Sequence, residues 1–264
     1  MAVDAQSKAR LDLALVERGL CRSRTQARTC IQRGGVQING LCVDKPSILV
    51  HEQDLVELHQ GPPYVSRGGE KLEDALRFFQ IDMQDKFCLD AGASTGGFTD
   101  CMLAHGARRV VAIDVGQNQL APRLREDSRV EWHEKTDARA LPDAIRAMRF
   151  DFIAVDLSFI SLSQALPHLF DLAADGGLLL ALVKPQFEAG RGRVDKGVVR
   201  DIAVRAACVE KIACQITQAP GWEILGTKEA SPHGTDGNVE YFIHACYCGN
   251  PTTTFLASRF SPDK

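Results

Sequence analysis

Two charged side chains follow apolar segments of the chain in positions that suit proton transfer. Asp156 comes directly after residues 150–155, and Lys184 comes directly after residues 178–183. If both segments are strands of one parallel sheet, these side chains meet at its carboxyl edge, where such sheets bind ligands. A lysine is mostly protonated at neutral pH, so Lys184 can act as a base only where its surroundings favour the neutral amine. Otherwise Lys184 orients a hydroxyl group and Asp156 takes the proton, and the sequence leaves both assignments open.

A glycine-rich segment earlier in the chain predicts a turn that binds a nucleoside. The segment reads Asp90-Ala91-Gly92-Ala93-Ser94-Thr95-Gly96-Gly97-Phe98. Its glycines allow sharp turns and a close approach of the backbone to a ligand. The spacing fits neither the G-x-G-x-x-G dinucleotide pattern nor a P-loop, which requires a lysine followed by serine or threonine. A glycine loop with acidic flanks and no such lysine suits a nucleoside that carries a sulfonium cation, which points to S-adenosylmethionine.

Three aspartates lie at or just beyond successive predicted strand ends, namely Asp90, Asp114 and Asp137. We expect them to border the methionyl amine, to hold the ribose hydroxyls and to accept from the adenine amino group, respectively. Asp156 is expected to line the same site. Each aspartate could instead cap a helix or lie in a solvated loop. An acid after the second strand also suits an NAD-dependent enzyme, which stays open on this feature alone.

The elements that must position these residues alternate along the second part of the chain. Apolar runs at 87–90, 110–113, 150–155 and 178–183 predict buried strands separated by helices, with a loop before the helix that begins near residue 202. This alternation predicts an α/β fold with a mostly parallel sheet and right-handed crossovers. A last strand at 239–243 is predicted to pair with 224–228. If it runs antiparallel, Glu240 lies near Asp156 and Lys184.

The front of the chain predicts a small α+β module with a basic face. Apolar spacing predicts one helix that ends at Gly19 and a second that starts at Ser23, where Gln26 completes a capping box. Residues 36–43 predict two short strands around the turn Asn39-Gly40. Seven basic and two acidic residues lie between positions 8 and 33.

This module resembles an S4 RNA-binding domain over about residues 8–60. The motifs that carry the resemblance are Arg10-Leu11-Asp12, Arg18-Gly19, Ser23-Arg24, Ala27, Gly34-Gly35, Asn39-Gly40 and Lys45-Pro46. The alternative is an unrelated helical hairpin with a solvated basic face. The resemblance implies phosphate contacts that position the protein on RNA without reading its sequence. The implied RNA-binding residues are Arg10, Arg18, Arg22, Arg24, Arg28, Arg33 and Lys45.

Composition limits the remaining classes of function. The formal net charge of −3 argues against indiscriminate coating of nucleic acid, so we expect any RNA contact to be local. The nine cysteines are an odd number and no secretion signal is recognised, so reduced thiols are expected. Cys246 and Cys248 have no further histidine or cysteine at zinc spacing, and no metal site is predicted. The apolar runs are too short to span a membrane, and we expect a cytoplasmic protein without an obligate protein partner.

Four residues look like the Lys-Asp-Lys-Glu tetrad of FtsJ-like ribose 2′-O-methyltransferases, namely Lys71, Asp156, Lys184 and Glu240. With the S4-like module in front, the segments 90–98, 155–162, 183–188 and 238–242 resemble the TlyA (hemolysin A) family over about residues 8–245. The resemblance implies a Rossmann-like class I methyltransferase domain with a seven-stranded sheet and an antiparallel last strand. It also implies methylation of cytidine ribose in ribosomal RNA of the large subunit, and in some members of both subunits.

The predicted boundaries are 1–60 for the S4 domain, 61–65 for a linker, 66–250 for the methyltransferase domain and 251–264 for a tail. The glycine-rich stretch 188–201 contains Arg191 and Arg193 close after the candidate catalytic lysine. We expect a mobile loop that closes on the RNA backbone, with an ordinary exposed linker as the alternative.

Other activities are weighed against this hypothesis. The sequence at Asp156 has neither the Asn/Asp-Pro-Pro-aromatic tetrapeptide of amino-methylating enzymes nor the cysteine of pyrimidine C5 methylases. A membrane-active hemolysin would need a long helix with an apolar stripe and a basic face, and the sequence predicts no such helix. A ribosome-binding factor with an inactive methyltransferase domain would need no intact tetrad.

Overall fold

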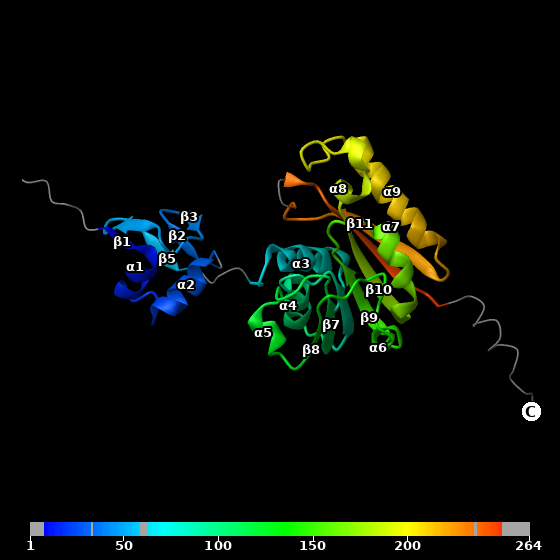
Figure 1. The fold of residues 1–264 in the computed structure, drawn as a ribbon, viewed down its shortest axis with the longest axis horizontal. Helices are drawn as coiled ribbons and strands as arrows, with labels where there is room; N and C mark the ends of the chain where they lie inside the picture. The colour runs from blue at the N-terminus through cyan, green and yellow to red at the C-terminus, as the bar shows by residue number, and fades with distance from the viewer. Residues whose placement is uncertain (1–7, 33, 59–62, 235–236, 250–264) are drawn as a thin grey trace, which may run out of the picture. The chain divides into compact units, whose positions relative to one another are not determined.

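The computed structural model describes residues 8–32, 34–58, 63–234 and 237–249 (Figure 1). The chain divides into two compact units, Met1–Val65 and Ser66–Lys264. Arg33, part of the predicted linker and the predicted tail lie outside the described residues.

The first unit combines two helices with short strands. Its elements are β1 (Lys8–Arg10), α1 (Leu11–Glu17), α2 (Arg24–Gln32), β2 (Val36–Ile38), β3 (Leu41–Val43), β4 (Leu49–His51) and β5 (Val56–Leu58). Strands β3, β2 and β5 form one antiparallel sheet, and β1 pairs with β4. The predicted Asn-Gly turn is confirmed, because Asn39 and Gly40 both have positive φ angles and join β2 to β3. Leu11, Leu15 and Ile31 are fully buried between the helices and the strands.

The start of α2 departs in one detail from the predicted capping box. Ser23 Oγ accepts a hydrogen bond from the Gln26 backbone N–H at 3.2 Å, as expected. The Gln26 side chain, however, accepts from the backbone N–H of Arg22 at 2.8 Å and not from that of Ser23. The Gln26 side chain thus binds a backbone N–H one residue earlier in the chain than in a simple capping box.

The second unit is a mostly parallel sheet with helices on both faces (Figure 1). Its strands are β6 (Phe87–Ala91), β7 (Arg109–Ile113), β8 (Val130–His133), β9 (Phe150–Val155), β10 (Ala173–Val183), β11 (Trp222–Glu229) and β12 (Tyr241–Tyr247). Their order in the described part of the chain is β11-β12-β10-β9-β6-β7-β8, seven strands in all. Only β12 runs antiparallel to its neighbours, β10 and β11, which confirms the predicted antiparallel last strand.

Helices of unequal length connect these strands. They are α3 (Arg67–Phe79), α4 (Gly97–Ala104), α5 (Pro122–Arg125), α6 (Asp143–Arg146), α7 (Leu162–Ala165), α8 (Pro185–Glu188) and α9 (Ile202–Gln218), with 3-10 turns η1 (Leu166–His168), η2 (Phe170–Leu172) and η3 (Arg191–Arg193). α9 lies against β11 and β12, and α3 packs against α4 (Figure 1). Because apolar side chains are buried on both faces, the central strands are almost uninterrupted runs of apolar residues.

Candidate active site

The glycine loop brings the end of β6 against the end of β9. Gly92 has φ +95°, and a Cβ atom added there would overlap the carbonyl oxygen of Asp156. Gly96 also has φ +95°, and a side chain there would overlap Leu120 and Leu124. A side chain at either position would therefore both strain the backbone and push the loop off its neighbours. The absence of a side chain at Gly92 is thus required for the contact between the glycine loop and the backbone of Asp156.

Asp90 lies at the bottom of this loop as a fully buried carboxylate. Its Oδ2 atom accepts hydrogen bonds from the backbone N–H and the hydroxyl of Thr99, at 2.9 and 2.6 Å. Among the described residues its Oδ1 atom has no hydrogen-bond partner. Burial is the largest of the causes that raise the pKa of Asp90 to about 7; the nearby Asp156 and Asp114 carboxylates also raise it, and the hydrogen bonds from Thr99 lower it. A positively charged ligand would supply the donor that this buried oxygen lacks.

A cavity of about 420 Å³ opens beside the loop at the carboxyl ends of β6, β7 and β9. It is lined by Gly92, Asp114, Asp137 and Asp156, among others. Asp114 accepts hydrogen bonds from the backbone N–H groups of Ser94 and Gly116, at 2.7 and 2.6 Å. These bonds fix the carboxylate at the cavity wall.

Asp137 is held differently from what the sequence alone suggests. Its carboxylate forms a forked ion pair with Arg139, with 2.6 Å between Asp137 Oδ2 and the nearer terminal nitrogen of Arg139. The Arg139 guanidinium holds the pKa of Asp137 below its usual range. Arg139 is not among the predicted site residues, although its spacing of two residues from Asp137 is typical of such a local pair. The carboxylate of Asp137 therefore reaches the cavity already engaged by a cation.

A second cavity, of about 270 Å³, adjoins the first and brings the four tetrad residues together. Lys71 Nζ lies 2.6 Å from Glu240 Oε2, and both side chains are buried. Lys184 Nζ lies 2.5 Å from Asp156 Oδ1. These four side chains come from α3, from the ends of β9 and β10, and from the residue before β12. The predicted placement of Glu240 beside the ends of β9 and β10 follows from the antiparallel pairing of β12 with β10, in which Val183 lies opposite Tyr241.

Two polar residues that are not among the predicted site residues contact the tetrad, and one of them, Ser158, also lines this cavity. Gln186 Nε2 donates to Glu240 Oε1 at 3.2 Å, and Ser158 Oγ accepts from Lys184 Nζ at 3.0 Å. Each lies two residues after a tetrad member, Lys184 or Asp156. A small polar residue at that spacing beyond a strand end is the signal that could have identified them.

The loop after α8 is attached to the segment that carries Glu240. Asn238 accepts from the backbone N–H of Val199 at 3.4 Å and donates to the carbonyl of Gly197 at 2.9 Å. Val199 is buried. Arg193, expected to contact RNA, is exposed in η3, whereas the side chain of Arg191 lies outside the described residues. The far end of the predicted loop is therefore anchored beside the tetrad.

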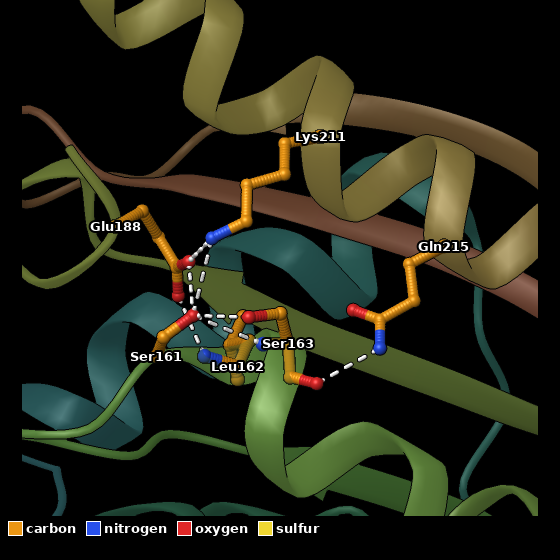
Figure 2. A network of polar contacts seen from close by, with 6 residues as sticks. All are labelled: Ser161, Leu162, Ser163, Glu188, Lys211 and Gln215. Atoms are coloured by element: carbon orange, nitrogen blue, oxygen red, sulfur yellow. Dashed lines mark hydrogen bonds and ion pairs between the residues drawn. The ribbon is translucent and has the colours of Figure 1, made fainter. Parts of the chain in front are cut away.

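A buried carboxylate ties the loops after β9 and β10 to helix α9 (Figure 2). Glu188 accepts from the Ser161 hydroxyl at 2.5 Å, from the Leu162 backbone N–H at 2.6 Å and from Lys211 Nζ at 3.0 Å. Figure 2 shows Lys211 and Gln215 reaching down from α9 to these loops. Because Asp156 and Lys184 precede the two joined segments, Glu188 restrains the elements that carry them.

The basic residues of the first unit surround a buried acid. The fully buried carboxylate of Asp12 lies 3.0 Å from the Arg10 guanidinium, 2.9 Å from that of Arg24 and 4.0 Å from that of Arg28. Its hydrogen bond to Arg10 is the largest cause that lowers the pKa of Asp12 to about 2. One negative charge thus aligns three guanidinium groups that remain partly exposed.

The other predicted RNA contacts of this unit fall into two groups. Arg18 donates to the backbone carbonyls of Asp54 and His51, at 2.7 and 2.8 Å, and so holds the loop between β4 and β5. Arg22 and Lys45 are exposed. The structure therefore gives Arg18 a structural contact that its spacing in the sequence did not reveal.

The fold and the two joined cavities define a class I methyltransferase: a seven-stranded sheet with one antiparallel strand, and a glycine loop beside an acidic cavity. Comparison with known proteins agrees with this class. A family model described as FtsJ-like methyltransferase matches residues 64–247, and an S4 domain model matches residues 9–56. The chain belongs to the FtsJ-like methyltransferase family and carries an S4 domain in front of the catalytic domain.

Comparison with individual proteins shows which members of that family the chain is similar to. The chain is 47% identical over 240 residues to the 16S/23S rRNA (cytidine-2′-O)-methyltransferase TlyA of Mycobacterium tuberculosis, with 89% of each chain covered. It is 38% identical to the 23S rRNA (cytidine-2′-O)-methyltransferase TlyA of Campylobacter jejuni, over 69% of this chain and 70% of that protein. A solved structure described as a hemolysin from Streptococcus thermophilus is 38% identical, with a TM-score of 0.70 over 94% of this chain and 91% of that one. The helices in the described ranges are all too short or too polar to cross a membrane.

Proposed function

We propose that this protein transfers a methyl group from S-adenosylmethionine to the ribose 2′-hydroxyl of a cytidine in ribosomal RNA. The observation that carries the proposal is the convergence of Lys71, Asp156, Lys184 and Glu240 on one cavity that adjoins the acidic nucleoside cavity. The names of the two TlyA relatives support the choice of cytidine and of ribosomal RNA as substrate.

The residues at the first cavity suit S-adenosylmethionine. Asp90, fully buried just before the glycine loop, offers an oxygen that has no donor among the described residues, which fits the methionyl amine. Asp114 lines the cavity with a fixed carboxylate, which fits ribose hydroxyls. Gly92 and Ser94 border both cavities and Ala93 borders the second, all with little side-chain volume. When bound, the cofactor supplies a methyl group on a sulfonium sulfur, which is open to attack by an oxygen nucleophile.

The tetrad residues align the ribose and take up its proton. Transfer of the methyl group to the 2′-oxygen would form a C–O bond, break the C–S bond and release the hydroxyl proton. We place that proton on the Lys184–Asp156 pair, whose side chains lie in close contact. The Lys71–Glu240 pair, held by Gln186, forms the opposite wall and orients the ribose.

The S4 domain would hold the enzyme on RNA. Arg10, Arg24 and Arg28 present an aligned set of guanidinium groups, and Arg22 and Lys45 add exposed charges. These groups fit phosphates, and so contribute affinity and register but no choice of base. The flipped or single-stranded cytidine would be selected in the catalytic domain.

Transfer of labelled methyl groups to ribosomal RNA in separated subunits, prepared from cells that lack this protein, tests the proposal. We expect label with the wild type and with Lys86→Ala, a control whose lysine lies outside both cavities. We expect no label with Lys184→Ala. A wild-type protein that binds subunits but labels neither would show a ribosome-binding factor instead of an enzyme.

A further inference from the structure

The amine of Lys184 has two neighbours, and they differ in how they direct it. Asp156 Oδ1 lies 2.5 Å from Nζ, but this contact is an ion pair without hydrogen-bond alignment, and Oδ1 has no hydrogen bond within the described residues. Ser158 Oγ lies 3.0 Å from Nζ with hydrogen-bond geometry. Charge attraction is nearly independent of direction, whereas a hydrogen bond is directional. The serine therefore adds a directional hydrogen bond to the ion pair that Lys184 forms with Asp156.

The donors and the lone pair of the lysine amine determine what remains for the substrate once Ser158 is bound. A charged lysine amine has three N–H donors, and a neutral one has two donors and a lone pair. Ser158 accepts from one N–H group of the amine, and the Asp156 carboxylate lies against the same amine. Lys184 also lines the tetrad cavity, which is the space proposed for the ribose. With Ser158 holding one N–H group, the amine keeps a donor for the 2′-hydroxyl when it is charged and a lone pair as an acceptor when it is neutral.

Ser158 is held in place by the loop that carries it. The loop starts where the Asp156 backbone N–H donates to the carbonyl of Ala91 at 2.9 Å, and it ends where Ser161 and Leu162 bind Glu188. Phe159, the next residue, has φ +66°, a conformation that persists only where the surrounding structure fixes it. Ser158 also lines both cavities, so it stands between the cofactor space and the tetrad.

We propose that Ser158 is a positioning residue for methyl transfer, whose hydroxyl aims the Lys184 amine at the ribose 2′-hydroxyl. This inference rests on the proposed function and adds to it a residue outside the Lys-Asp-Lys-Glu tetrad. Ser158 is exposed, so the loss of its hydroxyl leaves no buried group behind and no effect on folding is expected.

Single-turnover methyl transfer with enzyme in excess over RNA tests the inference. We expect Ser158→Ala to lower the transfer rate constant about 10- to 100-fold, the effect of one hydrogen bond to a charged group. The dissociation constant for RNA should stay the same, as should the melting temperature. Ser158→Thr keeps the acceptor and should restore most of the rate, which a merely steric role would not explain.

The outcomes separate the two proposals. A Ser158→Ala rate equal to the wild-type rate, with Lys184→Ala inactive, would overturn the positioning role and leave the proposed function intact. Equal loss in Ser158→Ala and Ser158→Thr would also overturn it, because the hydroxyl would not be the cause. A wild-type protein without transfer would overturn both.

Discussion

At the scale of single residues, burial distinguishes carboxylates that the sequence presents as equivalent. Asp90 lies near the end of β6, and Asp114 and Asp137 follow β7 and β8. Asp90 is fully buried and has one oxygen without a hydrogen-bond partner among the described residues, whereas Asp114 is fixed by two backbone N–H groups and Asp137 is paired with Arg139. Burial raises the pKa of Asp90 to about 7, whereas the Arg139 guanidinium holds the pKa of Asp137 below its usual range. The same residue type at three strand ends therefore provides three different environments.

The raised pKa of Asp90 makes the stability of the protein depend on pH. Its pKa is about 7 in the folded state and near 3.8 without the burial, so between these values the folded form holds the extra proton. The stabilising contribution is fully present below pH 3.8 and is lost as the pH rises through 7, by roughly 1 kcal/mol per pH unit. Asp90→Asn keeps an acceptor for Thr99 but cannot ionise.

We therefore expect Asp90→Asn to gain stability relative to the wild type as the pH rises from 5 to 8. Denaturant unfolding of the cofactor-free protein at several pH values measures this difference. Asp143→Asn, at an exposed position, is the control and should show a constant difference. A constant difference for Asp90→Asn as well would show that the Asp90 carboxyl does not hold its proton in the folded state.

At the scale of elements, the strongly apolar strands could be predicted from the sequence and the others could not. Strands β6, β7 and β9 lie in the sheet centre, and their apolar runs identified them almost to the residue. β8 was not delimited, because Val130–His133 is a partly exposed edge strand without an apolar run. β10 extends back to Ala173 through a bulge that contains two glycines, which the composition of that segment conceals.

The candidate site, like the strands, could be predicted only in part. Asp156, Lys184 and Glu240 could be predicted because each lies at the boundary of a strand, whereas Lys71, inside α3, was identified by its resemblance to a known pattern. Ser158 and Gln186 were missed because their contacts with Lys184 and Glu240 join segments far apart in the sequence, and Arg139 was missed although it lies two residues from Asp137.

The contact between the glycine loop and the β9 loop gives a prediction for Gly92. A Cβ there would overlap the Asp156 carbonyl and would also have to adopt φ +95°. Gly176 has φ +74° and nothing within 4 Å of an added Cβ, so Gly176→Ala carries the backbone strain alone. We expect Gly92→Ala to lower the free energy of unfolding by clearly more than the roughly 1 kcal/mol of Gly176→Ala, and to abolish cofactor binding. Equal costs in thermal unfolding would contradict the close contact.

The Glu188 network in Figure 2 predicts how the loops after β9 and β10 are restrained. Glu188→Ala removes the acceptor for Ser161, Leu162 and Lys211 together, whereas Lys211→Met removes one donor and leaves the two loop contacts. Hydrogen exchange should therefore become faster in residues 156–163 for Glu188→Ala, by at least about 10-fold for a loss of 1.4 kcal/mol. Lys211→Met should change it much less. Identical exchange in both variants would show that Glu188 does not hold the loop.

At the scale of the whole molecule, the proposed function assigns RNA binding to the first unit and methyl transfer to the second. The first unit has its own buried core and a basic face, and the second contains the joined cavities. RNA affinity and methyl transfer should therefore respond to different substitutions. The net charge of −3 keeps attraction to RNA local to the basic face.

The contacts of the first unit predict opposite effects for two kinds of basic residue. Arg22→Ala and Lys45→Ala should weaken RNA binding and reduce its salt dependence by about one ion per lost phosphate contact, without effect on unfolding. Arg18→Ala should instead destabilise this unit, because His51 and Asp54 lose their donor. Filter binding at several salt concentrations and thermal unfolding measure the two effects. An Arg18→Ala protein of normal stability with weakened RNA binding would contradict the structural role.

The position of the transferred methyl group tests the central claim most directly. A methyl group on the 2′-oxygen blocks alkaline cleavage of the adjacent phosphodiester, whereas a methyl group on a base does not. RNA labelled by the wild-type protein is therefore hydrolysed in alkali and separated by size. The proposed chemistry predicts label in alkali-stable dinucleotides that begin with cytidine. Label in mononucleotides would show base methylation and contradict the account.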